Sequence, residues 1–198
     1  MKNLWSDTDS TLFKDDLALR VYSSRLLGQD PTLVLHGGGN TSVKIIESNI
    51  LGDMEEILYV KGSGWDLEFI EKAGFSPVRV KHMQSLAKLD NLSDPQMVNE
   101  LKTQLTNASS PTPSVETILH AILPFKYVDH THSDAVVTVT NTLEGKDRIR
   151  EIYGDRVVII PYVMPGFDLA KEVARIFSEQ STDKTEGMVL MNHGIFSF

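Results

Sequence analysis

Two histidines separated by a single residue, His130 and His132, are the residues in this sequence that point most directly to chemistry. The segment that contains them is typical of a β-strand, in which residues i and i+2 project from the same face, about 6.6 Å apart along the chain. Two imidazoles placed in this way can share one divalent cation. A catalytic zinc site usually has three protein ligands and an open position, so a third ligand must come from elsewhere.

His193 is the candidate for that third ligand, because it follows an apolar run at 188–191 and precedes Gly194, as expected at the end of a strand. The chain has no cysteine, so any metal must be held by imidazole, carboxylate or water, and Zn²⁺ is the expected ion. Spacing alone leaves the alternative of ordinary half-buried histidines open. We interpret His36, His82 and His120 as surface residues or as residues that support the site.

Glu116 is the carboxylate expected closest to this chemistry. It follows Ser114, the expected N-cap of a helix over 115–122, where the helix dipole alone would account for an acidic residue. A carboxylate beside a metal can also complete its coordination or take a proton from a bound substrate. His120 lies one helical turn further on and could orient Glu116.

Two glycine-rich segments could bind an anion through backbone amides. The first, at 37–42, adds side-chain donors from Asn40, Thr41 and Ser42. The second, at 61–64, places a lysine and Ser63 beside flexible backbone. Neither matches the P-loop or the dinucleotide-binding fingerprint. They predict a site for phosphate or carboxylate, with a plain tight turn as the alternative.

The composition narrows the class of protein. The chain has 198 residues, 41% hydrophobic and 23% charged, which suits one globular domain. Its net charge is −8 and it has no cluster of basic residues, so nucleic acid is not an expected partner. The sequence has neither a secretory apolar core nor a run of about 18 apolar residues, so we expect no membrane association and a cytoplasmic location.

The pattern along the chain predicts helices and strands without regular alternation, which favours a layered sheet covered by helices over a doubly wound parallel fold. We expect helices at 9–27, 95–105, 115–122 and 169–177, the second with Ser93 as its N-cap. Strands are expected at 32–35, 43–46, 57–60, 127–132, 157–160 and 188–191. The Pro- and Ser-rich segment at 107–113 is expected to be a loop at the edge of the active site.

The sequence resembles class II aldolases of the aldolase/adducin type, a family that includes fuculose- and rhamnulose-phosphate aldolases and ribulose-phosphate 4-epimerase. The resemblance spans nearly the whole chain. It rests on five motifs in the family's order: Gly-Gly-Asn-Thr-Ser at 38–42, Lys-Gly-Ser-Gly at 61–64, Ser-Val-Glu at 114–116, His-Thr-His at 130–132 and Asn-His-Gly at 192–194.

The resemblance implies a role for each matched residue. It makes His130, His132 and His193 the ligands of zinc or another divalent cation, and Glu116 the catalytic acid/base. It assigns phosphate contacts to Asn40, Ser63, Gly64 and Ser114. It also implies an α/β fold, a three-layer α/β/α sandwich around a mainly antiparallel sheet, assembled as a homo-oligomer, commonly a tetramer with active sites between subunits.

Among the family, the stretch at 60–66 is most similar to the aldolase half of bifunctional aldolase/short-chain dehydrogenase proteins that act on rhamnulose phosphate. We therefore expect residues 1–198 to be an aldolase/adducin-like domain, truncated at its C-terminus and part of a longer chain. Val115 stands where simple fuculose-phosphate aldolases have a second phosphate-binding serine. The tyrosine that donates a proton is not matched, although Tyr153 and Tyr162 are available.

The expected reaction is aldol cleavage of a ketose 1-phosphate. The substrate would chelate the cation through its carbonyl and a hydroxyl, the metal would stabilise an enediolate, and Glu116 would shuttle the proton. One alternative is a sugar-phosphate epimerase or dehydratase on the same scaffold. Another is a non-catalytic, adducin-like interaction domain, against which the presence of all three histidines argues.

Overall fold

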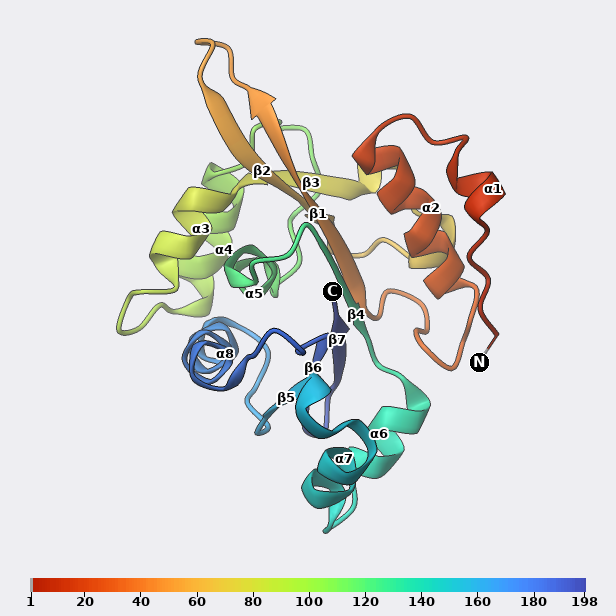
Figure 1. Cartoon of the computed structure of the whole chain (residues 1–198). Coiled ribbons are helices and arrows are strands. Elements are labelled where there is room, and N and C mark those ends of the chain that lie inside the picture. Colours follow the sequence, from red (N-terminus) through yellow and green to blue (C-terminus); the bar gives the residue numbers. More distant parts are fainter. Residues whose placement is uncertain (1) are drawn as a thin grey trace.

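The computed structural model describes residues 2–198 and shows a single seven-stranded sheet with helices on both faces (Figure 1). The sheet order is β3-β2-β1-β4-β7-β6-β5. Every neighbouring pair is antiparallel except β5 and β6, which are parallel. The strands are β1 (Asn40–Ser48), β2 (Met54–Lys61), β3 (Phe75–Arg79), β4 (Tyr127–Thr131), β5 (Val157–Ile160), β6 (Gly187–Leu190) and β7 (Gly194–Ser197).

The helices connect these strands and form the two outer layers. Short 3-10 turns lie at η1 (Leu67–Phe69), η2 (Lys72–Gly74) and η3 (Gly154–Arg156). The α-helices are α1 (Asp7–Ser10), α2 (Asp16–Gly28), α3 (Val80–Leu86), α4 (Asp94–Thr103), α5 (Thr117–Ile122), α6 (Asp134–Thr140), α7 (Gly145–Tyr153) and α8 (Phe167–Gln180). In the described part of the chain, no helix is both long and apolar enough to cross a bilayer.

Side-chain alternation along the strands assigns helices α2 to α8 to the two faces of the sheet. On β6, Met188 and Leu190 belong to the large core beneath α3, α4, α5 and α8, whereas Val189 packs with α6 and α7 on the opposite face. On β2, Leu58 belongs to the same large core, and Tyr59 packs against the cluster beneath α2. The predicted three-layer α/β/α sandwich with a mainly antiparallel sheet is thus confirmed.

Several predicted elements are confirmed, with boundaries set by local capping. Ser93 and Gln96 form a capping box at the start of α4, and the strand expected at 157–160 is β5. The helix expected over 9–27 is instead two helices. Asp15 caps α2 by accepting a hydrogen bond from the Ala18 N–H at 2.7 Å, which fixes the start of that helix at Asp16.

The prediction of a strand at 32–35 was wrong, because this segment forms a turn and a loop. Asp30 holds this segment in a turn, because its side chain accepts hydrogen bonds from the Thr32 N–H at 2.9 Å and the Thr32 hydroxyl at 2.6 Å. The glycines at 37–39 therefore precede a strand and do not follow one. Gly39 has a φ of +62°, and a Cβ there would lie 2.7 Å from the His130 carbonyl oxygen, so a side chain would meet the β4 backbone.

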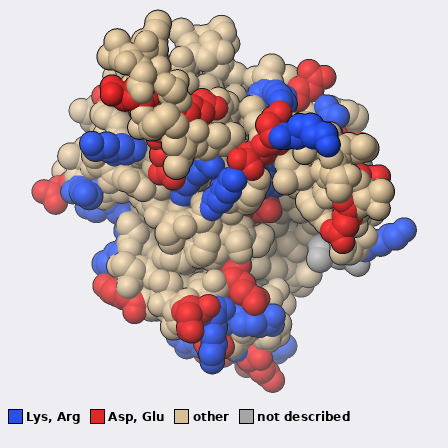
Figure 2. Space-filling model, turned by 45° about the horizontal axis from the view of Figure 1, so that its top comes forward, with Lys and Arg blue, Asp and Glu red and all other residues tan. Residues whose placement is uncertain are grey.

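On the face shown in Figure 2, Lys and Arg lie among Asp and Glu, and the projecting part at the top is largely uncharged. The tip of the hairpin formed by β1 and β2 carries exposed Ile50, Leu51 and Met54. Within this view, no broad field of one sign gathers over the surface.

Candidate functional site

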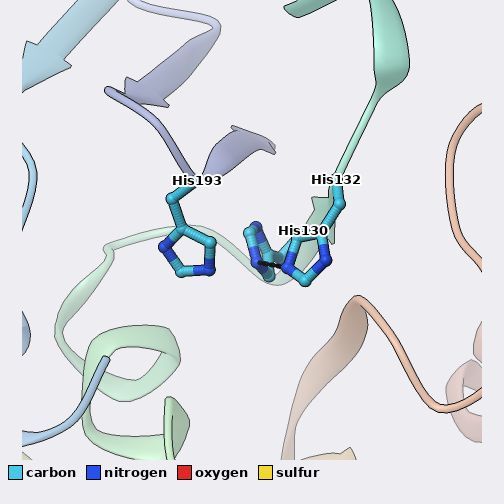
Figure 3. Close-up of side chains that lie close together, drawn as sticks. All are labelled: His130, His132 and His193. Carbon is cyan, nitrogen blue, oxygen red and sulfur yellow. Dashed lines mark hydrogen bonds between the residues drawn. The ribbon is translucent and has the colours of Figure 1, made fainter. Parts of the chain in front are cut away.

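The three predicted imidazoles converge from two separate parts of the sheet (Figure 3). His130 lies in β4, and His132 directly follows the end of this strand at Thr131. His193 lies in the tight turn between β6 and β7. Because β7 pairs with β4, with Thr131 opposite Ile195, this turn is brought next to the end of β4. One candidate ligand atom from each histidine lies within 4.8 Å of those of the other two.

The turn that carries His193 depends on two residues with unusual requirements. Asn192 adopts a left-handed conformation with φ of 58°, which asparagine tolerates better than most residues. Its side chain donates hydrogen bonds to the Thr140 carbonyl at 3.2 Å and to Asn141 Oδ1 at 2.9 Å, which fixes the turn to the end of α6. A Cβ on Gly194 would collide with the Thr131 carbonyl oxygen and lie 3.1 Å from His130 Cε1.

His130 is oriented by its own environment. It is fully buried, its ring stacks on Phe196 at a centroid distance of 4.2 Å, and its Nδ1 lies 3.2 Å from the Ile195 carbonyl oxygen. A proton on Nδ1 satisfies that carbonyl and leaves Nε2 as the electron-pair donor, 3.1 Å from His132 Nε2. Burial, together with His132, lowers the pKa of His130 to about 3. The ring is therefore neutral at ordinary pH.

Glu116 lies directly beside the imidazoles. It occupies the N-cap position of α5, just before the first turn in which it was expected, and it is 5% exposed. Its Oε2 lies 3.6 Å from His130 Nε2, and its Oε1 lies 3.8 Å from His193 Nε2. Burial raises the pKa of Glu116, whereas His193, the hydrogen bond from Asn40, His132 and Lys61 all act to lower it.

Two buried polar atoms of Glu116 and the neighbouring histidines make no hydrogen bond to any part of the chain that the structure describes. Glu116 Oε1 and His193 Nδ1 are buried and have no hydrogen-bond partner among the described residues. Buried polar atoms of this kind are uncommon in folded proteins and call for a specific explanation, such as an ion or a ligand. Burial also lowers the pKa of His193 to about 4, so its imidazole has a lone pair to offer a cation.

A cleft of about 280 Å³ opens onto this cluster. Residues 37–40 of the first glycine-rich segment and 61–64 of the second line this cleft. Five of the predicted site residues outside the histidine triad therefore lie at one place: Asn40, Ser63, Gly64, Ser114 and Glu116. The Pro- and Ser-rich loop borders this region as expected, because the Ser63 N–H donates to the Thr112 carbonyl at 2.8 Å. A larger cleft of about 660 Å³, beside Lys44 and Phe125, has no histidine in its lining.

The structure does not bring the Thr41 side chain into the cleft. Asn40 and Thr41 are adjacent in β1 and so project to opposite faces of the sheet. Thr41 is fully buried and its hydroxyl lies 2.7 Å from Ser24 Oγ of α2. Lys61, by contrast, lines the cleft although it was not among the predicted phosphate contacts, and its Nζ donates to the Gly37 carbonyl at 2.9 Å. Its position in the second glycine-rich segment was the available signal.

Comparison with known proteins agrees with this architecture. The family described as Class II Aldolase and Adducin N-terminal domain matches residues 19–198. A solved structure of the N-terminal class II aldolase domain of a conserved protein from Thermoplasma acidophilum is 45% identical, with a TM-score of 0.90, over 100% of this chain and 89% of that one. An L-fuculose 1-phosphate aldolase has the same fold at 14% identity, with a TM-score of 0.56, over 98% of this chain and 76% of that one.

A curated relative extends well beyond the matched region. The uncharacterized oxidoreductase YuxG of Bacillus subtilis (strain 168) is 36% identical over 100% of this chain, and the chain spans 28% of that protein's length. The match of the family to most of the chain, and the likeness to the Thermoplasma domain, agree with the arrangement of histidines, glutamate and glycine-rich segments. This chain is a member of the class II aldolase and adducin family.

Proposed function

We propose that this protein catalyses the metal-dependent aldol cleavage of a ketose 1-phosphate, of the rhamnulose- or fuculose-phosphate type. One observation carries the proposal: the buried carboxylate of Glu116, with an unpartnered oxygen, lies beside three convergent imidazoles at the wall of a glycine-rich cleft. An acid/base group, a cation site and an anion site at one place are the parts that this reaction requires.

The donor set fits a divalent cation, and zinc is the expected one. Two nitrogens bound to one zinc ion at about 2.0–2.1 Å lie roughly 3.3 Å apart at a tetrahedral angle. His130 Nε2 and His132 Nε2 are 3.1 Å apart, close to that spacing. His193 has to move slightly inward, because the three ligand atoms span up to 4.8 Å. When bound there, the cation would supply Lewis acidity to a carbonyl oxygen of the substrate.

Glu116 would exchange the proton. In aldol cleavage a hydroxyl proton leaves as the carbon–carbon bond breaks, and a proton is later returned to the carbon that held the bond. Because burial raises its pKa, the protonated form of Glu116 is more accessible than that of an ordinary carboxyl group, so Glu116 can hold a proton in one step and release it in the next. Its role as a base also requires the ionised form, which the hydrogen bond from Asn40 at 2.6 Å supports.

The glycine-rich side of the cleft would bind the phosphate group. Ser63, Gly64, Ser114 and Asn40 lie there, together with the buried lysine Lys61. Backbone amides and hydroxyls hold a phosphate in place, and a lysine adds a point charge. Holding the phosphate at this distance from the imidazoles would position the reacting carbons.

A coupled assay for release of the ketose fragment, with L-fuculose 1-phosphate and L-rhamnulose 1-phosphate as substrates, tests this proposal. We expect cleavage by the zinc-loaded protein and a loss of about 10²–10⁴-fold in kcat for Glu116→Gln with zinc retained. Zinc loss in Glu116→Gln would make Glu116 a ligand instead of the acid/base. Exposed Glu71→Gln is the matched control and should leave the rate unchanged.

An epimerase assay and a measurement of zinc content, run beside the cleavage assay, separate the alternatives. Interconversion of ribulose and xylulose 5-phosphates without fragment release would indicate an epimerase on the same scaffold. A zinc-free protein with no activity toward any of these substrates would favour a non-catalytic, adducin-like domain. The expected homo-oligomer and cytoplasmic location stay predictions, and light scattering of the purified protein tests the first.

A further inference from the structure

A series of hydrogen-bonded, buried polar side chains connects Ser42, near the start of β1, to the carboxylate in the cleft. Ser42 Oγ lies 2.8 Å from His120 Nδ1, and His120 Nε2 is hydrogen-bonded to Asn40 Oδ1. The Asn40 amide nitrogen then donates to Glu116 Oε2 at 2.6 Å. All four side chains are buried, and His120 is completely shielded from solvent.

The chemistry of these groups permits only one donor-to-acceptor direction along this series of hydrogen bonds. An ionised carboxylate only accepts hydrogen bonds, so Asn40 must turn its NH₂ toward Glu116 and its carbonyl toward His120. His120 Nε2 must then carry a proton. Burial lowers the pKa of His120 well below its usual value, so the ring is neutral and its Nδ1 accepts from the Ser42 hydroxyl. The reverse order would place an amide oxygen against the carboxylate.

We propose that His120 is a positioning residue: it holds the Asn40 amide against Glu116 Oε2, so that Oε1 is the carboxylate oxygen left to exchange the proton in the cleft. This inference rests on the proposed function and adds to it. With Oε2 occupied, Oε1 has no hydrogen-bond partner among residues 2–198 and is the oxygen that lies 3.8 Å from His193 Nε2.

His120 also has a packing role that must be separated from positioning. Its ring contacts Phe196 at a centroid distance of 5.4 Å, and Phe196 stacks on His130. A change at His120 could therefore disturb a metal ligand without any effect through Asn40. Metal content distinguishes the two effects. A packing defect would disturb His130 and lower the zinc content, whereas loss of the hydrogen bond to Asn40 would leave His130 and the zinc content unchanged.

A matched pair of substitutions isolates the donor to Asn40. The amide nitrogen of glutamine reaches the place of His120 Nε2, whereas asparagine reaches only the place of Nδ1. We expect His120→Asn to lower kcat for ketose phosphate cleavage about 10- to 100-fold with little change in KM or zinc content. His120→Gln should recover most of that loss. Equal losses in both variants, or full activity in His120→Asn, would overturn the proposal.

A second measurement does not depend on activity and uses a variant only to assign the His120 signal. Long-range ¹⁵N–¹H correlation spectra of the labelled wild-type protein report the tautomer of each histidine, and the signal missing in His120→Gln identifies His120. We expect the Nε2–H tautomer, and an Nδ1–H tautomer would refute the proposed direction of the chain. If the wild type cleaves no ketose phosphate, the proposed function fails while the tautomer still decides the hydrogen-bond chain.

Discussion

Loss of the buried ion pair between Arg20 and Asp129 should destabilise the protein by an amount that depends on which partner is removed. Arg20 Nη2 lies 2.6 Å from Asp129 Oδ1, with side chains 1% and 28% exposed, respectively. The pair joins α2 to β4, one residue before His130. Arginine stays charged at any accessible pH, so Asp129→Ala leaves a buried guanidinium without its counter-ion. Its remaining partners include Ser24, the Ser42 carbonyl and the Tyr127 ring.

Breaking a buried pair costs about 3–5 kcal/mol, and we expect Asp129→Ala to lie in this range. Arg20→Met should cost less, about 2–3 kcal/mol, because the carboxylate it leaves is partly hydrated and methionine fills much of the space. At about 2–4 °C per kcal/mol for a chain of this size, Asp129→Ala should lower Tm by about 6–20 °C. The exposed pair Lys72–Asp15, with side chains 53% and 55% exposed, is the control.

Urea denaturation of the metal-free variants measures these free energies of unfolding. Lys72→Met should change the free energy by less than about 1 kcal/mol. The double variant Arg20→Met/Asp129→Ala should cost less than the sum of the single changes, because it leaves no uncompensated charge. The reasoning is refuted if Arg20→Met costs more than Asp129→Ala, or if neither differs from the surface control.

Three further predictions concern the site. Lys61→Met should raise KM for a ketose phosphate about tenfold or more with zinc content unchanged, because a buried cation beside the phosphate site is lost; an unchanged KM in steady-state kinetics would contradict this. Gly194→Ala should reduce zinc affinity in competition titrations, because the new methyl group collides with the Thr131 carbonyl and crowds His130, and wild-type affinity would count against this geometry. For the metal-free protein, the pKa of His130 falls from 6.5 to about 3 on folding. Between these pH values the unfolded chain binds more protons than the folded one, so the free energy of unfolding is highest above about pH 6.5 and decreases as the pH falls toward about 3. His130→Phe, whose ring can still stack on Phe196, should show a shallower fall in unfolding free energy over this range, and equal slopes would show that His130 is not the group responsible.

Elements with strong local signals could be predicted from the sequence, and those defined by long-range pairing could not. The capping box at Ser93 and the apolar strand at 157–160 are local features, and both are present. The helix α6 (Asp134–Thr140) consists largely of β-branched residues, which do not favour a helix, and packing against α7 compensates for this. The strand β7 has only four residues and acquires its identity from its pairing with β4 and β6.

The candidate site shows the same division. The roles of His130, His132 and His193 were predicted from motifs, but their convergence depends on the pairing of β4 with β7, which no local pattern specifies. The position of Thr41 was not foreseeable either. Whether it or Asn40 faces the cleft is set by the register of β1 against β4, where Asn40 lies opposite His130.

The metal content of the purified protein and its histidine variants tests the central claim most directly. After loading with zinc and desalting, elemental analysis should find about one ion per chain in the wild type, as expected for a site with three protein ligands. His130→Ala, His132→Ala and His193→Ala should each lose the ion. His82→Ala should keep it, because His82 pairs with Glu100 at 2.7 Å instead of with the other imidazoles. Wild-type protein without zinc, or full zinc content in any of the first three variants, would contradict the assignment of these imidazoles to one ion.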